Sequence, residues 1–242
     1  MKMMTQIGRI DVHSHLLPGI DDGCATLEES VACAKRMVAA GYTHSFCTPH
    51  IWPDLPTNTI ENITAHVAKL QAELDAQNVS LQLIPGGEIG IRDHVPQLRF
   101  EQVVTFGMHR KFCLVDIWAK ELPPLFGKSV RHLQSFGLTV ILAHPERMAA
   151  VQEDWSLIDR FENMGLLLQG NLQCLDDPIS QPTRQLAEKL LSDGRYFMLG
   201  SDLHNLRTLD CRLRGLERAI ELVGEQKVWE LTREHPLQLL GE

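Results

Sequence analysis

Two histidines one residue apart follow the first apolar run of the chain, in the stretch "RIDVHSHLLPGIDDG", residues 9–23. Alternate residues of an extended strand point to the same side, so His13 and His15 face one way while Ser14 faces the other. Two neighbouring imidazoles can bind one metal ion. The stretch therefore predicts part of a metal site, to which other segments must add ligands.

Side chains of the same kinds follow most of the other apolar runs. They occur in "FCTPH", "GGEI", "LVDIW", "LAHPER" and "GSDLH". Because α/β folds place their active sites at the carboxyl ends of strands, we expect these groups to meet. The sequence thus predicts eight metal-ligating side chains: His13, His15, His50, Glu88, Asp116, His144, Asp202 and His204.

Imidazole and carboxylate groups without cysteine suit Mn²⁺, Fe²⁺, Zn²⁺ or Mg²⁺, and they disfavour copper or an iron–sulfur cluster. Eight ligands exceed the need of one ion, so we expect two or three ions that share bridging carboxylates. Such a cluster lowers the pKa of bound water toward about 7 and holds phosphoryl oxygens. The expected chemistry is metal-assisted hydrolysis.

The elements that position these residues are seven short β-rich runs alternating with helical patterns. Continuous apolar runs between helices are typical of a mostly parallel sheet covered on both faces, although the pattern alone does not separate a barrel from an open doubly wound sheet. We predict one domain over residues 1–242, closed by C-terminal helices. The predicted strands span 9–13, 43–49, 80–89, 112–118, 138–144, 165–171 and 195–202, and the predicted helices span 26–41, 58–77, 127–137, 154–165 and 180–194.

Composition narrows the class of protein. The chain has 23 basic and 31 acidic residues, a formal net charge of −8, and no basic stripe, which argues against nucleic acid as a partner. It shows neither a secretory signal nor an apolar run of the roughly 20 residues that span a membrane. Six cysteines without a Cys-x-x-Cys pair indicate free thiols. We expect a soluble, cytoplasmic protein.

The motifs "DVHSHLLPGIDDG", "TPH", "GGEI", "AHPER" and "SDLHN", in this order, resemble the PHP (polymerase and histidinol phosphatase) superfamily. The first motif is most similar to bacterial manganese-dependent tyrosine-protein phosphatases of the CpsB/YwqE type. The resemblance covers roughly residues 9–210. It implies a distorted (β/α)7 barrel with a metal site at the carboxyl ends of the strands. It also implies dephosphorylation of a tyrosine autokinase in exopolysaccharide or capsule production, with metal-bound hydroxide as nucleophile.

The resemblance further implies how the ligands divide among three ions, of which Mn²⁺ is the expected kind. His13, His15, Glu88 and Asp202 would hold the first ion. Glu88 would bridge to a second ion that is also held by His144 and by the carboxylate after the fourth strand. Asp22 would join His50 and His204 at the third ion, and Asp22 and His50 would take part in catalysis. Arg147 matches the phosphate-binding arginine of the family.

Two positions depart from the family pattern. The fourth-strand carboxylate is usually glutamate, whereas "LVDIW" offers Asp116, whose side chain is one methylene shorter. The second ion is therefore expected to shift, to bind more weakly or to take a water ligand. The family also has an arginine shortly after the Asp-x-His motif, for which Arg207 is the nearest candidate and Arg212 its rival.

Several side chains near the site leave alternatives open. Asp21 is interpreted as a turn residue before Gly23, with orientation of a histidine ligand as the alternative. Trp52 and Leu55, in the loop after His50, either stack on a phosphotyrosine ring or anchor their loop. Gln169 and Asn171, at the end of the sixth strand, are candidates for substrate contact without a ligand role.

The sequence is compatible with three functions. The leading hypothesis is a protein-tyrosine phosphatase. The second is a PHP phosphatase acting on a small phosphate monoester such as histidinol phosphate, or on a nucleotide diester. The third is a regulatory or scaffold protein in which Asp116 marks a weakened metal site. A cysteine-based phosphatase is excluded, because no cysteine has an arginine six positions later. The sequence does not indicate an oligomeric state.

Overall fold

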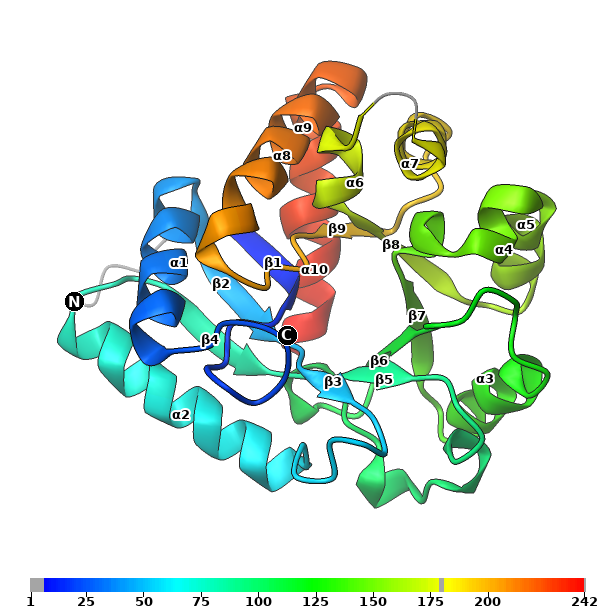
Figure 1. The fold of residues 1–242 in the computed structure, drawn as a ribbon, viewed down its shortest axis with the longest axis horizontal. Coiled ribbons are helices and arrows are strands. Elements are labelled where there is room, and N and C mark those ends of the chain that lie inside the picture. The colour runs from blue at the N-terminus through cyan, green and yellow to red at the C-terminus, as the bar shows by residue number, and fades with distance from the viewer. Residues whose placement is uncertain (1–6, 179–180, 242) are drawn as a thin grey trace.

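Parallel strands surrounded by helices make up the protein (Figure 1). The computed structural model describes residues 7–178 and 181–241. The ends of the predicted 1–242 domain and the first residue of the predicted 180–194 helix lie outside the described residues. Within the described part, no helix is long and apolar enough to cross a membrane.

The strands form two sheets in which every pairing is parallel. One sheet has the order β1 (Arg9–Ser14), β2 (Tyr42–Cys47) and β4 (Gln82–Pro85). The other has the order β3 (His50–Ile51), β5 (Glu88–Gly90), β6 (Phe112–Asp116), β7 (Thr139–Ala143), β8 (Leu167–Asn171) and β9 (Met198–Gly200). The mostly parallel α/β fold expected from the sequence is confirmed.

One predicted strand is broken into two pieces, and another ends earlier than expected. The run 80–89 gives β4 and β5, which are separated at Gly86 and Gly87. The run 43–49 gives β2, which ends at Cys47, and the short strand β3 begins just beyond the run, after Thr48 and Pro49. Proline lacks the N–H that a continuing strand needs. A Cβ on Gly87 would lie 2.8 Å from side-chain atoms of Ile51 and Val104, so only glycine permits this close approach.

The ends of the first and last strands lie side by side. The Asp202 amide donates to the His13 carbonyl at 2.7 Å, and the His15 amide donates to the Leu203 carbonyl at 2.8 Å. Ser14 and Leu203 form an isolated parallel bridge. The carboxyl ends of β1 and β9 therefore meet at the place where both carry histidine and aspartate.

The predicted helices form close to their expected bounds, and several short helices were not expected. Thr26 caps the start of α1, because its hydroxyl accepts from the Glu29 amide at 3.2 Å. The Glu29 carboxylate accepts from the Ala25 amide, one residue before the cap, and not from the Thr26 amide as a capping box requires. The helices are α1 (Leu27–Ala39), α2 (Ile60–Ala76), α3 (Phe126–Ser135), α4 (Ala149–Glu153), α5 (Ser156–Asn163), α6 (Leu172–Asp176), α7 (Pro182–Ser192), α8 (Leu209–Val223), α9 (Glu225–Trp229) and α10 (His235–Leu237).

Two apolar cores hold the strands in place. The larger lies mainly between the strands and the surrounding helices. The smaller gathers strand residues such as Val12 and Ile141 with Leu239 from the C-terminal segment. This segment, drawn in red in Figure 1, passes behind the strands, and its Thr232 hydroxyl accepts from the Arg9 guanidinium at 2.7 Å. The C-terminal helices thus pack against the strands, as expected.

Candidate metal centre

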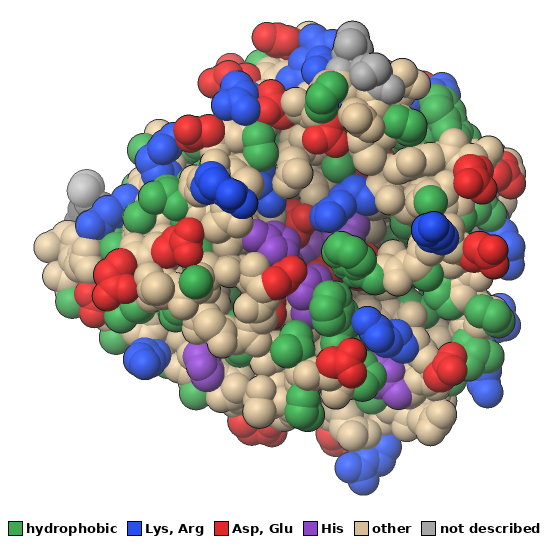
Figure 2. Space-filling view, in the orientation of Figure 1, with side chains coloured by type: hydrophobic (Ala, Val, Ile, Leu, Met, Phe, Trp, Pro, Cys, Tyr) green, Lys and Arg blue, Asp and Glu red, His purple; other side chains and the backbone are tan. Residues whose placement is uncertain are grey.

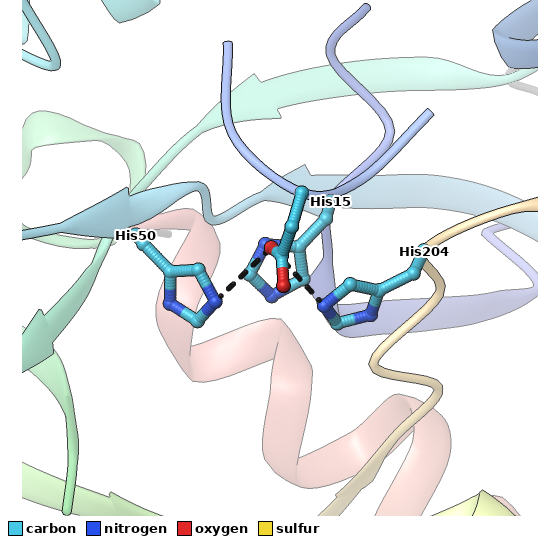
Figure 3. Close-up of side chains that lie close together, drawn as sticks. His15, His50 and His204 are labelled. Carbon is cyan, nitrogen blue, oxygen red and sulfur yellow. Dashed lines mark ion pairs between the residues drawn. The ribbon is translucent and has the colours of Figure 1, made fainter. Parts of the chain in front are cut away.

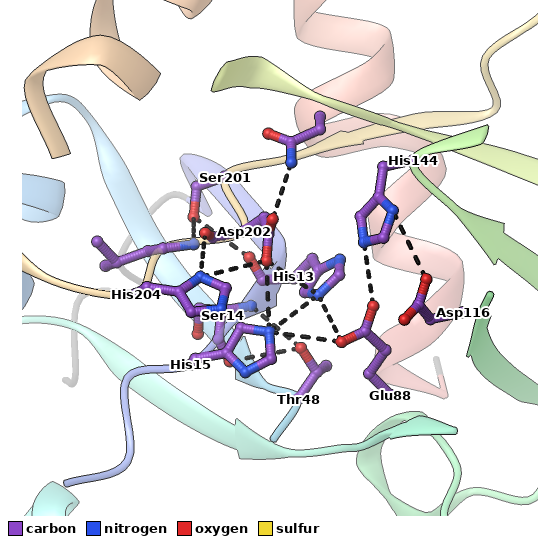
Figure 4. Close-up of polar contacts among 12 residues, drawn as sticks. His13, Ser14, His15, Thr48, Glu88, Asp116, His144, Ser201, Asp202 and His204 are labelled. Atoms are coloured by element: carbon purple, nitrogen blue, oxygen red, sulfur yellow. Dashed lines mark hydrogen bonds and ion pairs between the residues drawn. The ribbon is translucent and has the colours of Figure 1, made fainter. Parts of the chain in front are cut away.

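The end of β1 supplies two buried histidines that face two buried carboxylates (Figure 4). His13 Nε2 and His15 Nε2 lie 3.2 Å apart. Glu88 Oε2 is 3.5 Å from each Nε2, and Asp202 Oδ1 is 3.4 Å from His13 Nε2 and 3.3 Å from His15 Nε2. The structure therefore brings together the four residues expected at the first ion.

A second group joins the first through Glu88. Its Oε1 atom lies 3.1 Å from His144 Nε2, while its Oε2 atom faces His13 and His15. His144 Nδ1 lies 3.8 Å from Asp116 Oδ1. Glu88, Asp116 and His144 can each offer one atom within 4.8 Å of the others. The Glu88 carboxylate is thus placed between two groups, as a bridging ligand must be.

A third group includes His15, His50 and His204 (Figure 3). Asp22 Oδ1 is 3.3 Å from His50 Nε2 and 3.5 Å from His204 Nε2. His15 can add an atom within 4.8 Å of all three. The Asp22 side chain is 60% exposed, in contrast to the buried carboxylates of the other two groups. This group therefore forms the accessible side of the cluster.

The donor set fits divalent metal ions. Glu88 Oε2, Asp116 Oδ2 and both ring nitrogens of His50 are buried without a hydrogen-bond partner, although unpaired buried polar atoms are normally costly. His50 Nδ1 lies 2.8 Å from Glu88 Oε2 but without the geometry of a hydrogen bond. Bonds of about 2.1 Å to one ion place neighbouring ligand atoms roughly 3.0–3.5 Å apart. Most separations within the cluster lie in this range, which explains both the crowding and the unpaired atoms.

Buried polar side chains orient the inner groups. Asp21 Oδ2 accepts from His15 Nδ1 at 2.7 Å, and Gln169 Oε1 accepts from His13 Nδ1 at 2.8 Å. Both contacts direct the Nε2 atom of the histidine toward the cluster. The side-chain amide of Asn171 donates to Asp202 Oδ2 at 2.8 Å. The interpretation of Asp21 as a turn residue alone was wrong. Asp21 Oδ1 accepts from the Gly23 backbone amide, as a turn residue would, but Asp21 Oδ2 orients His15.

Two residues that the sequence analysis did not single out in these roles fix the loop after β9. Asp11 is fully buried and accepts from the amide and the hydroxyl of Ser201 at 2.9 and 2.6 Å. Arg212 is buried, and its guanidinium donates to the carbonyl oxygens of Ser201, Asp202 and Thr208. Arg212 is therefore a structural residue, and its candidacy for phosphate contact was wrong.

The backbone at two strand ends is left-handed. His144 has φ 32° and Asp202 has φ 51°, although neither is glycine. Such conformations cost roughly 1–3 kcal/mol each and occur preferentially at functional sites. The Asp11 and Arg212 contacts hold the segment that contains Asp202, so the surrounding structure offsets this cost.

Arg147 lies at the edge of the cluster. Its Nη1 atom donates to Asp202 Oδ2 at 2.7 Å, and its side chain is 36% exposed. The guanidinium is therefore tied to the cluster and still reachable by a ligand. Arg207 is exposed, and its guanidinium has no polar partner among the described residues. Its role in substrate binding stays a prediction.

Histidine and carboxylate charges balance each other within the cluster. Burial alone would raise the pKa of Glu88, but the charge of His13 and hydrogen bonds from histidines hold it well below its usual value. Burial alone would lower the pKa of His50 and of His144, but the neighbouring carboxylates raise each to about 9. Burial and the charge of Glu88 raise the pKa of Asp116 to about 6. Bound cations would take over the role of these protons.

The Trp52 ring stacks on the His50 ring, with centroids 3.9 Å apart and an interplanar angle of 19°. The indole lies so close to β5 that a Cβ on Gly90 would come within 2.6 Å of it. Trp52 thus packs against a candidate ligand, which favours its interpretation as a loop anchor.

Fold and site together define a parallel α/β protein with a candidate polynuclear metal centre at its strand ends. Residues 9–241 match the family described as capsular polysaccharide synthesis, CpsB/CapC, and the chain belongs to this family. The resemblance expected from the motifs is confirmed.

Named relatives match most of the chain. Tyrosine-protein phosphatase YwqE of Bacillus subtilis is 26% identical over 82% of this chain and 78% of its own length. Tyrosine-protein phosphatase CpsB of Streptococcus agalactiae is 25% identical over 89% of this chain and 95% of its own length. A solved structure of the metal-dependent tyrosine phosphatases YwqE of B. subtilis and CpsB of Streptococcus pneumoniae matches with a TM-score of 0.87 and 25% identity, over 96% of this chain and 94% of that one. A phosphotriesterase homology protein of Escherichia coli, at 11% identity and a TM-score of 0.60, shares the fold.

Proposed function

We propose that this chain is a metal-dependent tyrosine-protein phosphatase that hydrolyses phosphotyrosine in proteins. The observation that carries the proposal is the meeting of three groups of potential metal ligands beside one half-exposed arginine. Relatives that span most of the chain are named as tyrosine-protein phosphatases, and a solved match is named as metal-dependent.

The proposed roles of the side chains in the cluster follow from their exposure to solvent. Arg147 presents a planar fork of N–H donors at the cluster edge, suited to two oxygens of a phosphoryl group. Asp22, His50 and His204 form the accessible side of the cluster, and the buried groups hold its geometry. Divalent ions bound by these groups would make coordinated water acidic and offset the charge of the phosphoryl oxygens.

We assign His13, His15, Asp22, His50, Glu88, Asp116, His144, Asp202 and His204 as the ligands of two or three ions. Mn²⁺ is the proposed ion, with Fe²⁺, Zn²⁺ and Mg²⁺ as alternatives, since the ligands are imidazole and carboxylate. We also propose that the chain is one domain with a distorted (β/α)7 barrel. The hydrogen bonds between the ends of β1 and β9 support this proposal.

The proposed substrate is a phosphorylated tyrosine autokinase that controls capsule or exopolysaccharide production. The description of the family supports the link to capsule. The proposed compartment is the cytoplasm, which agrees with six cysteines that are all free thiols.

The test is phosphate release from a phosphotyrosyl peptide by chelator-stripped protein that is reloaded with Mn²⁺. His144→Ala serves as the blank, and histidinol phosphate is run in parallel. Metal-dependent release from the peptide that resists iodoacetamide supports the proposal. Release only from histidinol phosphate assigns the small-monoester function instead. Release from neither contradicts an enzymatic role and favours the regulatory one.

A further inference from the structure

Trp118 is the most exposed large hydrophobic side chain among the described residues, with 63% of its surface accessible. It lies two residues beyond Asp116, the last residue of β6. Figure 2 shows histidines in a hollow of this face, bordered by basic and hydrophobic side chains. Tryptophan is enriched among the residues that contribute most to binding at protein surfaces.

The Trp118 ring lies at the wall of a cavity of about 350 Å³. Ile117, Trp118, Met148 and Ala149 form its apolar lining, and Lys120 lies at the same wall. Asp116, His144 and Arg147 complete the lining, so the cavity is continuous with the metal centre. Its size and mixed lining are those of a small-molecule subsite.

The Trp118 ring contacts two side chains of the site. Its ring meets Trp52 edge-on at a centroid distance of 6.4 Å, and the Arg147 guanidinium carbon lies 5.9 Å from its centroid. Such contacts are weakly attractive and fix ring orientation. The residue expected to bind phosphate thus lies against the ring that lines the neighbouring cavity.

A second cavity also touches the cluster, on the side of Asp22 and His50. Three carboxylates line it, from Asp21, Asp22 and Asp54, and no Lys or Arg does. A dianionic phosphoester is repelled there and attracted by Arg147 and Lys120. The charges therefore favour the cavity beside Trp118 for the substrate.

We propose that Trp118 and this cavity form the subsite for the aromatic ring of the phosphotyrosyl group, and that Trp118 selects aryl over ring-free phosphates. This inference rests on the proposed function. The phosphate of phosphotyrosine lies at one edge of its ring, so a ring in contact with Trp118 extends from Arg147 along the apolar wall. The subsite explains how a metal centre without intrinsic preference for an ester recognises tyrosine.

The test compares Trp118→Ala, Trp118→Phe and Trp155→Ala in the Mn²⁺-loaded full chain. Trp155 is the matched control, because it is 41% exposed and does not line the cavity. The readouts are kcat and KM for a phosphotyrosyl peptide and for phenyl phosphate, and the inhibition constant of inorganic phosphate, which has no ring. Metal content and melting temperature are checked for each variant.

Trp118→Ala is expected to raise KM for both aryl substrates about tenfold, equivalent to ~1.4 kcal/mol, with kcat and phosphate inhibition unchanged. Trp118→Phe is expected to restore most of the affinity, and Trp155→Ala to behave as wild type. An unchanged KM in Trp118→Ala would overturn the inference. A rise in the inhibition constant of phosphate as large as the rise in KM would also overturn it, because Trp118 would then act only through Arg147. Failure of the wild type to hydrolyse either substrate would contradict the proposed function and the inference with it.

Discussion

Asp21 Oδ2 accepts a hydrogen bond from His15 Nδ1 at 2.7 Å, and the same oxygen accepts from the His50 amide at 3.0 Å. One carboxylate therefore orients an inner ligand and fixes the backbone of an outer one. Carboxylates in this position also increase the basicity of the histidine that they contact.

Asp21→Asn is expected to weaken Mn²⁺ binding by roughly 10–100-fold while the fold persists, because the amide loses the charge that supports His15. Competition with a fluorescent chelator measures the affinity. Asp54→Asn is the matched control, since Asp54 lines the same loop cavity and its side chain is 80% exposed. Equal affinities in wild type and Asp21→Asn would show that the contact has no part in metal binding.

Arg147→Ala is expected to raise KM for a phosphotyrosyl peptide about tenfold or more, because a charge-assisted contact to phosphate is lost. Metal content should stay at the wild-type level, since Asn171 still holds Asp202. Steady-state kinetics and elemental analysis measure the two quantities. Arg214→Ala, which removes an exposed arginine paired with Asp176, is the control. Loss of metal in Arg147→Ala would reassign the residue to a structural role.

Asp116→Asn is expected to lower the bound metal by about one ion per chain and to reduce kcat by about 100-fold or more, because the uncharged amide is a weaker ligand than a carboxylate. Asp116→Glu should keep the full metal content, since it restores the residue usual in the family. Metal titration with parallel kinetics makes the comparison. Full metal content and activity in Asp116→Asn would remove Asp116 from the ligand set.

The metal-free protein is expected to lose stability as the pH rises from about 6.5 to 9. The pKa values of His50 and His144 are about 9 in the folded chain, above the ordinary 6.5, because neighbouring carboxylates outweigh burial. Groups with a raised pKa stabilise the fold fully below their unfolded value, and the effect disappears as the pH passes the folded value. Bound Mn²⁺ replaces these protons, so the loaded protein should lack the decline. The melting temperatures of both forms, measured across this pH range, test the prediction. The same decline with pH in both forms would contradict it.

The strand-end ligands could be predicted from the sequence because each follows an apolar run. His13, Asp116 and His144 obey this rule, and a parallel sheet brings such positions together. Glu88, which was expected to end the third strand, instead begins the short strand β5. The break between β4 and β5 could not be predicted, because it depends on the packing of Gly87 against two distant side chains.

The roles of the supporting residues could not be decided from the sequence, which offered orientation of a histidine only as an alternative for Asp21 and substrate contact for Gln169. Asp21 and Gln169 occur in segments whose local pattern is the same whether the side chain faces the site or a turn. Arg212 occupies an ordinary position of α8, and its contacts to carbonyls after β9 arise only from tertiary packing. Exposure of Trp118 is equally invisible in the run "LVDIW".

The most direct test of the central claim, that nine side chains at the strand ends form one polynuclear metal centre, is anomalous diffraction from crystals of the Mn²⁺-loaded protein. The account predicts peaks within bonding distance of the three groups, with Glu88 between two of them. Peaks elsewhere, or an active crystal without a peak at these side chains, would contradict it.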